Sequence, residues 1–316
     1  MRVLLDTNVW ESLAQASAGE RLRVLASKLG HEILVSPAVV YEAIRNPDGT
    51  ARKVTLDLLT NASWTRLMPE AFSEADELLR ELERLRPEWL ETSPDLRGFR
   101  INRRDWTSKE RFWRRVRIDP DSISSTIEGL QGAYLNTARS EAALRRAEFD
   151  GADWKFESTD LRKLVATTRR NEQNVTVDAW RLASMNAATQ ALSLASAGQH
   201  PYEDWLLCFL RRKSISTEGW ASFWIVEVEV ERMPRQWLRW ATEVLAALRK
   251  VSRGTPADIQ LATYLVEADA FLTCDKVLAS ILTKCRSEAP FQLAESRLLP
   301  GGPEGVTALF EYLRSA

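Results

Sequence analysis

Both ends of the chain alternate short apolar segments with helical ones, and this alternation constrains the fold more than any other feature. Residues 2–5 predict a buried strand that ends at Asp6, and residues 31–35 predict a second strand. Near the other end, residues 270–273 again predict a strand between two helices. Short apolar strands separated by helices are typical of a parallel sheet. We therefore expect an α/β fold.

The segment after the second predicted strand carries a clear helix start. Ser36 suits the N-cap position and Pro37 suits the first helical position, and apolar residues follow up to Ile44. Two further strand signals lie at residues 64–68 and before Pro300. These signals extend the same α/β pattern toward the middle of the chain from both ends.

The middle of the chain follows a different pattern. From about residue 70 to 250, apolar residues recur mostly at helical spacing. Residues 226–231 alternate Val and Glu, which suits either a strand or the acidic side of a helix. We therefore expect a core made of residues 1–84 and 252–316, interrupted by a mostly α-helical insertion at 85–251.

The composition limits the kinds of site that the chain can build. Its 316 residues are 45% apolar and 28% charged, which is typical of a folded protein, and the formal net charge is only −1. Three cysteines and two histidines are too few for a disulfide framework, a four-cysteine zinc site or a histidine-based metal site. Carboxylates remain as the metal ligands that the sequence can offer.

Neither the first residues nor any later segment resembles an export or membrane signal. Only three consecutive apolar residues precede Asp6, and no apolar run approaches the roughly 20 residues of a membrane span. We therefore expect a cytoplasmic protein that makes no membrane contact.

Four acidic residues occupy positions that matter in such a fold. Asp6 follows the first strand, Asp275 follows the strand at 270–273, and Glu42 and Asp258 lie in helices next to strands. The carboxyl ends of parallel strands meet at one edge, where ligands bind. Four converging carboxylates cannot all ionise without a counter-charge, and an all-oxygen ligand set suits Mg²⁺ or Mn²⁺. The pattern therefore predicts a metal site.

Each of these acids also has a simpler interpretation. Asp6 and Asp275 can serve as N-caps of the helices that follow them. Thr255 and Asp258 have the spacing of a capping box, and Glu42 can lie on the solvated face of its helix. The metal interpretation rests on the occurrence of all four acids in order around an α/β core.

Four short motifs resemble those of PIN-domain nucleases, most closely the bacterial toxin ribonucleases of toxin–antitoxin pairs. They are Asp6-Thr7-Asn8, Glu42 at the end of Ser-Pro-Ala-Val-Val-Tyr-Glu, Asp258 in Ala-Asp-Ile-Gln-Leu-Ala, and Thr273-Cys274-Asp275. The resemblance covers about residues 1–85 and 252–316. It implies a parallel sheet of about five strands flanked by helices. The long insertion departs from the simple toxins of the family.

The resemblance also implies an activity and partners. The activity is metal-dependent hydrolysis of phosphodiester bonds, usually in RNA, with Mg²⁺ or Mn²⁺. By resemblance, Asp6, Glu42, Asp258 and Asp275 are the catalytic metal ligands, and Asn8 and Thr273 are supporting polar residues. The partners that it implies are RNA or another single-stranded nucleic acid, an antitoxin protein and a second copy of the chain in a homodimer.

A basic segment inside the predicted insertion suggests a substrate surface. Residues 97–117 hold nine basic residues, Lys109 among them, against two acidic ones, with aromatic residues between them. Basic side chains neutralise phosphates and aromatic rings stack on unpaired bases. The candidate nucleic-acid-binding residues are Arg100, Arg103, Arg104, Trp106, Arg111, Trp113, Arg114 and Arg115.

Other interpretations of this segment and of the whole chain stay open. Trp106 and Trp113 can be core residues, and the arginines can pair with acidic segments such as Glu227 to Glu231. The chain can also be a PIN-like DNA nuclease in defence or repair. A third hypothesis is a nucleic-acid-binding module without catalysis that keeps the carboxylates for structure.

Overall fold

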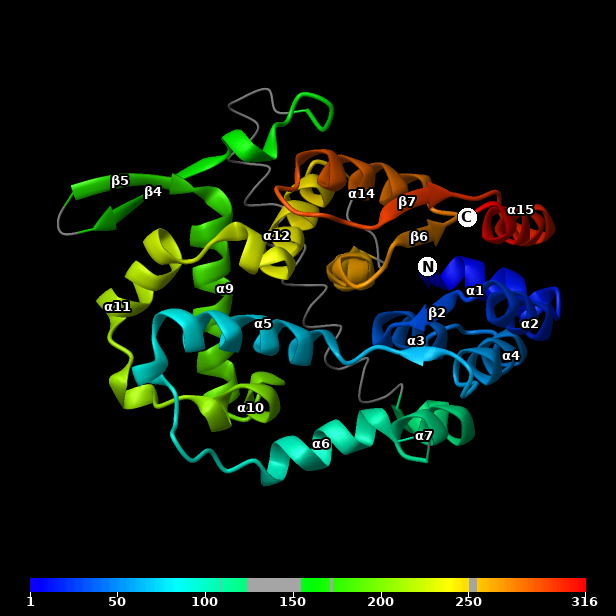
Figure 1. Cartoon of the computed structure of the whole chain (residues 1–316), viewed down its shortest axis with the longest axis horizontal. Helices are drawn as coiled ribbons and strands as arrows, with labels where there is room; N and C mark the ends of the chain where they lie inside the picture. Colours follow the sequence, from blue (N-terminus) through cyan, green and yellow to red (C-terminus); the bar gives the residue numbers. More distant parts are fainter. Residues whose placement is uncertain (109, 124–154, 171–172, 250–254) are drawn as a thin grey trace. The chain divides into compact units, whose positions relative to one another are not determined.

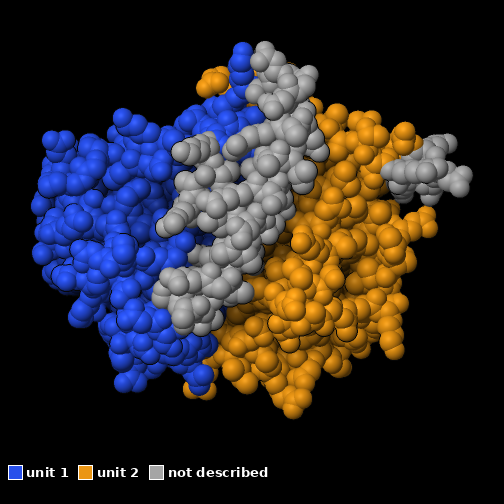
Figure 2. Space-filling view, turned by 180° about the vertical axis from the view of Figure 1, so that it is seen from behind, with its two compact units in different colours: residues 1–69, 105–156, 242–316 blue, residues 70–104, 157–241 orange. Residues whose placement is uncertain are grey.

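The computed structural model describes residues 1–108, 110–123, 155–170, 173–249 and 255–316. The chain divides into two compact units, which Figure 2 shows in different colours. Unit 1 comprises Met1–Pro69, Asp105–Phe156 and Thr242–Ala316, and unit 2 comprises Glu70–Arg104 and Glu157–Ala241. In the described parts, none of the helices has the length and apolar character needed to cross a membrane.

The observed unit borders differ from the predicted insertion at 85–251. Residues 70–84 belong to unit 2, whereas the described residues between 105 and 123 belong to unit 1. Two of the borders lie inside helices, namely α6 (Arg97–Thr107) and α12 (Pro234–Ala247). Domain borders are usually recognised by linkers rich in Pro, Gly or polar residues. A border inside a helix has no such linker, so it could not be predicted from the sequence.

Unit 1 is built on a parallel sheet, which confirms the predicted α/β fold class. The described residues form five strands in the order β3-β2-β1-β6-β7, and every neighbouring pair is parallel. The strands are β1 (Arg2–Leu5), β2 (Glu32–Val35), β3 (Thr65–Arg66), β6 (Ala270–Thr273) and β7 (Glu295–Leu298), and Figure 1 shows them in sequence colours. All five strand signals of the sequence are present.

The central strands are apolar on both faces because helices flank the sheet. Leu4 on β1, Leu34 on β2 and Phe271 on β6 are fully buried. The helices of unit 1 are α1 (Thr7–Gln15), α2 (Gly19–Leu29), α3 (Pro37–Ile44), α4 (Gly49–Leu59), α7 (Phe112–Ile118), α13 (Thr255–Ala262), α14 (Lys276–Glu288) and α15 (Gly302–Ser315), with the short turn η7 (Thr263–Val266). Ser36 caps α3 and Pro37 begins it, as predicted.

Unit 2 is mostly helical, as expected for the middle of the chain. Its helices are α5 (Glu70–Leu85), α9 (Ala179–Ser196), α10 (Tyr202–Trp205), α11 (Thr217–Ser222) and the π-helix η5 (Phe223–Glu227). The short turns are η1 (Pro87–Trp89), η2 (Leu161–Lys163), η3 (Leu207–Phe209), η4 (Arg212–Ser214) and η6 (Val230–Arg232). A two-stranded antiparallel hairpin joins β4 (Val165–Arg170) to β5 (Gln173–Asp178) and was not predicted.

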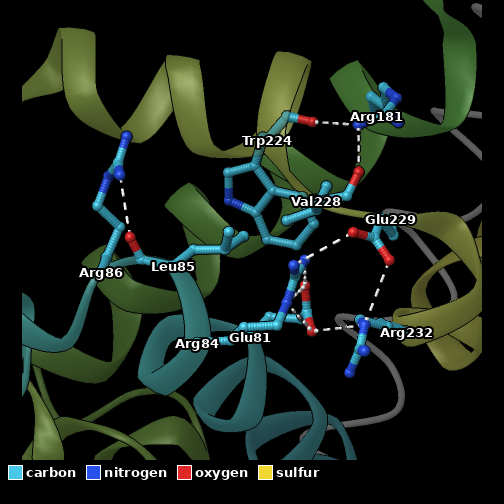
Figure 3. A network of polar contacts seen from close by, with 9 residues as sticks. All are labelled: Glu81, Arg84, Leu85, Arg86, Arg181, Trp224, Val228, Glu229 and Arg232. Carbon is cyan, nitrogen blue, oxygen red and sulfur yellow. Dashed lines mark hydrogen bonds and ion pairs between the residues drawn. The ribbon is translucent and has the colours of Figure 1, made fainter.

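The Val-Glu alternation at 226–231 is not a strand. Two of its glutamates, Glu227 and Glu229, enter ion pairs inside unit 2, part of which Figure 3 shows. Glu229 lies 3.2 Å from Arg84 and 3.3 Å from Arg232, and both arginines also approach the buried Glu81. Glu227 pairs with Arg86. These two glutamates therefore pair with arginines outside the basic segment at 97–117.

A buried glutamate in unit 2 gives a pH-dependent prediction. Glu77 accepts hydrogen bonds from the backbone N–H groups of Arg235 (3.0 Å) and Gln236 (3.2 Å) at the start of α12. Burial nevertheless raises the pKa of Glu77 to about 8. The folded state therefore binds this proton more tightly than the unfolded chain, and stability falls as the pH rises from about 4.5 to 8.

The Glu77→Gln variant should not show this fall in stability with rising pH, because an amide does not ionise. We expect the free energy of unfolding of the variant to exceed that of the wild type by an amount that grows from pH 5 to pH 8.5, reaching on the order of 1–3 kcal/mol. Urea unfolding at both pH values measures it. Glu83→Gln, an exposed position on the same helix, is the control. A difference that stays constant with pH would contradict the prediction.

Candidate active site

The predicted site residues meet at the carboxyl edge of the sheet in unit 1. Asp6 directly follows β1, and Asp275 lies two residues beyond the end of the neighbouring strand β6. Because β2 lies on one side of β1 and β6 on the other, this edge is the point at which the strand order reverses. Ligands of open parallel sheets bind at such points. The backbone N–H of Asp6 donates to the carbonyl of Leu272 (3.0 Å).

Both oxygens of the Asp6 carboxylate are held by neighbours. Asp6 is only 4% exposed, and its Oδ1 accepts from the backbone N–H of Thr7 (2.7 Å). Its Oδ2 accepts from Asn8 Nδ2 (2.7 Å) and from Thr273 Oγ1 (2.5 Å). Asn8 and Thr273, predicted as supporting polar residues, therefore both orient the same carboxylate.

The segment 273–275 is bound to the start of α1 by further hydrogen bonds. The backbone N–H of Cys274 donates to Asn8 Oδ1 (2.9 Å), and that of Asp275 donates to Thr273 Oγ1 (2.9 Å). Asp275 also caps α14, since its Oδ1 accepts from the N–H groups of Val277 and Leu278. The capping interpretation is therefore correct for this oxygen, and Oδ2 takes no hydrogen bond from the described residues.

Glu42 reaches the same place from α3. Its Oε2 accepts from the hydroxyl of Thr7 (2.6 Å), which joins it to the residue after Asp6. Burial raises the pKa of Glu42, and the charge of Asp275 raises it further, whereas the charge of Arg45 lowers it. Glu42 is therefore not a fully solvated surface residue.

Asp258 completes the set from the first turn of α13, which packs against α3. Burial raises the pKa of Asp258 to about 8, and the charges of Glu42, Asp6 and Asp275 add to the shift. Burial also raises the pKa of Asp6 to about 6, with a contribution from Glu42. The charges of Glu42, Asp6 and Asp275, which are distant from Asp258 in the sequence, therefore all act on Asp258.

The chemistry of this set fits a hard divalent cation. All of its donors are oxygens, and burial, followed by the charges of neighbouring carboxylates, raises the pKa of Asp6, Glu42 and Asp258, so a cation would favour their ionised forms. Among the described residues, however, no three His, Cys, Asp or Glu side chains form a preassembled metal cluster. The hydroxyls of Thr7 and Thr273 and the amide of Asn8 hold the carboxylates instead.

Two aromatic residues of the basic segment, Phe112 and Trp113, are core residues of unit 1. Trp113 is fully buried and donates from Nε1 to the carbonyl of Trp106 (2.7 Å). Phe112 is buried as well, with its ring centroid 3.9 Å from that of Trp106, and both rings contact Tyr41 edge-on. The prediction that Trp113 stacks on bases is therefore wrong, because the apolar side of a short helix points inward here.

The arginines of the basic segment are exposed, in agreement with a surface role. Arg100, Arg103 and Arg104 belong to unit 2, and Arg111, Arg114 and Arg115 belong to unit 1. Arg115 pairs with Asp105 (2.6 Å), and Arg114 lies 3.8 Å from Glu110. Lys109 lies outside the described residues.

Two residues of the site were not selected from the sequence. Thr7 joins Asp6 to Glu42, and it stands inside the quoted Asp6-Thr7-Asn8 motif. Arg45 lies three residues after Glu42, a spacing that brings two side chains to one face of a helix and could have identified it. Comparison of the chain with family models, with curated proteins and with solved structures found no match.

Proposed function

We propose that the chain is a metal-dependent endonuclease that hydrolyses phosphodiester bonds in RNA, similar to PIN-domain nucleases. One observation carries the proposal. Four carboxylates lie near the point at which the strand order of the parallel sheet reverses: Asp6 and Asp275 follow β1 and β6, and Glu42 and Asp258 lie on α3 and α13. Capping explains one oxygen of Asp6, at the start of α1, and one oxygen of Asp275, at the start of α14, but it does not explain why Glu42, Asp6 and Asp275 all act on Asp258.

The residues of the site have separate tasks in this proposal. Asp6, Glu42, Asp258 and Asp275 would hold Mg²⁺ or Mn²⁺, which offsets the charge of a phosphodiester and lowers the pKa of an attacking water. Asn8 and Thr273 orient Asp6, and Thr7 orients Glu42. Such outer contacts fix the geometry of a site before the substrate arrives.

The resemblance to toxin ribonucleases extends the proposal to the biological setting. It suggests a growth-inhibiting toxin that acts on RNA in the cytoplasm, with an antitoxin protein as a partner and a homodimer as the assembly. The large helical unit 2 distinguishes the chain from simple toxins.

Incubation of the purified chain with a single-stranded RNA tests the activity. We expect cleavage with Mn²⁺ or Mg²⁺, loss of cleavage with EDTA, and recovery when Mn²⁺ is added in excess, because carboxylates alone cannot activate water in this way. A DNA of identical sequence separates the ribonuclease from a DNA nuclease. Salt-sensitive RNA binding without cleavage under any metal would contradict the proposal and would favour a binding module.

A further inference from the structure

The helix α7 has one buried face and one basic face. Phe112, Trp113 and Val116 are buried, and the arginines at positions 111, 114, 115 and 117 are exposed. An amphipathic helix usually mixes both charge signs on its solvated face. Here the charged residues of the exposed face are all arginines, so this face attracts anionic ligands.

Nearby carboxylates account for only part of this charge. Arg115 is paired with Asp105 and Arg114 approaches Glu110. Arg111 and Arg117 form no ion pair with a carboxylate in the described residues. Within the described part of the chain, the arginines without an acidic partner therefore lie at the two ends of the helix.

Arg66 on β3 adds a further cation to this surface. Its guanidinium stacks on the ring of Trp113, 4.5 Å from the ring centroid, and donates to the carbonyl of Thr60 (2.9 Å). Its Nε atom is buried and has no partner among the described residues. Desolvation lowers the pKa of Arg66, and the charge of Arg117 lowers it further. Two guanidiniums therefore repel each other, which a bound anion would relieve.

Helix α7, which carries the basic face, packs against α3, the helix that carries Glu42. Tyr41, the residue before Glu42, contacts the rings of Trp106 and Phe112. Arg45, one turn further along, acts electrostatically on Glu42, and its own Nε is buried without a partner in the described part of the chain. A cation therefore stands beside the carboxylates, and helix α7 packs against the same helix α3 through Tyr41.

We propose that Arg45, Arg66, Arg111 and Arg117 form a phosphate-binding track for single-stranded RNA that leads to the four carboxylates. This arginine track rests on the proposed nuclease function and names how its substrate is held. Phe112 and Trp113, the two rings of α7, are buried and cannot stack on bases, so the arginines offer contacts to phosphates, which carry no sequence information. Binding along it is therefore independent of base sequence.

The test measures binding of a fluorescein-labelled single-stranded 20-nucleotide RNA by fluorescence anisotropy in EDTA, over about 50–200 mM NaCl. Each lost phosphate contact should reduce the slope of log affinity against log salt concentration by about 0.7. We therefore expect a reduction of about 1.4 for Arg111→Gln/Arg117→Gln and of about 0.7 for Arg45→Gln. Arg66 is left intact because it stacks on the core residue Trp113.

The matched control is Arg286→Gln/Arg314→Gln, which removes two exposed arginines from the last turns of α14 and α15 in the same unit. Its slope should equal that of the wild type. Equal slopes for all four proteins, or an equal reduction in the control, would overturn the arginine track.

Binding in EDTA requires neither a metal nor cleavage, so the two proposals can fail separately. If RNA is not cleaved but the track variants still reduce the slope, the nuclease proposal fails and the arginine track stands. If RNA is cleaved while the track variants bind like the control, the track fails and the nuclease proposal stands.

Discussion

The Asp258→Asn variant is expected to fold more stably than the wild type in EDTA and to cleave RNA at least about 100-fold more slowly with Mn²⁺. Its stability should rise because the carboxyl of Asp258 is buried beside three others. Its pKa is about 8 in the folded protein, against the usual value of 3.8 for an aspartate in the unfolded chain. Between these two pH values the unfolded chain is ionised and the folded chain must take up a proton, so the stability of the wild type falls as the pH rises. The amide carries no such cost.

The activity of this variant should fall for the opposite reason. An amide supplies one neutral oxygen in place of an anionic carboxylate, so the cation is held more weakly. Changes in residues that only orient metal ligands cost about 10–100-fold in affinity or activity, and a ligand itself should cost at least as much. A residue that destabilises the metal-free fold and is required for turnover is typical of a functional site.

Two measurements on each protein check this prediction. Thermal unfolding at pH 7.5 in EDTA and in Mn²⁺ should show that the metal stabilises the wild type but not Asp258→Asn, and RNA cleavage should be lost in parallel. Glu311→Gln, an exposed position on α15, should match the wild type in both measurements. A variant that is destabilised in EDTA, or that cleaves like the wild type, would show that Asp258 serves the structure alone.

The sheet and the carboxylates could be predicted because they depend on local signals. A buried central strand must be apolar on both faces, so residues 2–5 and 270–273 stand out as short apolar runs. Parallel topology then brings the residues after those strands to one edge, so the sequence predicts that Asp6 and Asp275 lie at the same edge. The hydroxyl of Thr7 was not foreseen because its role depends on the position of Glu42, which is a tertiary feature.

The structure of unit 2 was harder to predict because tertiary contacts, rather than the spacing of apolar residues along the chain, determine part of its secondary structure. The strands β4 and β5 are mostly polar or charged, and among the described residues no further strand pairs with this ribbon to demand an apolar run. The Val-Glu alternation at 226–231 suggested a strand, yet the fully buried Phe223 and Trp224 precede it and its first residues continue a π-helix. Packing of large aromatic residues overrode the local pattern there.

The Trp113→Ala variant should lose about 3–5 kcal/mol of unfolding free energy, because truncation of a buried aromatic side chain leaves a cavity. Trp113 is fully buried, its Nε1 donates to the carbonyl of Trp106, and its ring supports the guanidinium of Arg66. A base-stacking residue on the surface would instead leave stability unchanged and reduce RNA binding. The two roles therefore predict opposite results in urea unfolding.

Ile118→Ala provides the matched control, since this side chain on the same helix is 64% exposed and should change stability by less than about 0.5 kcal/mol. A loss for Trp113→Ala no larger than that of the control would show that the ring is not a core residue. A large loss has a consequence for the arginine track as well. The ring then fixes Arg66 and the basic face of α7 in place, so an RNA substrate meets a preformed cationic surface rather than a flexible one.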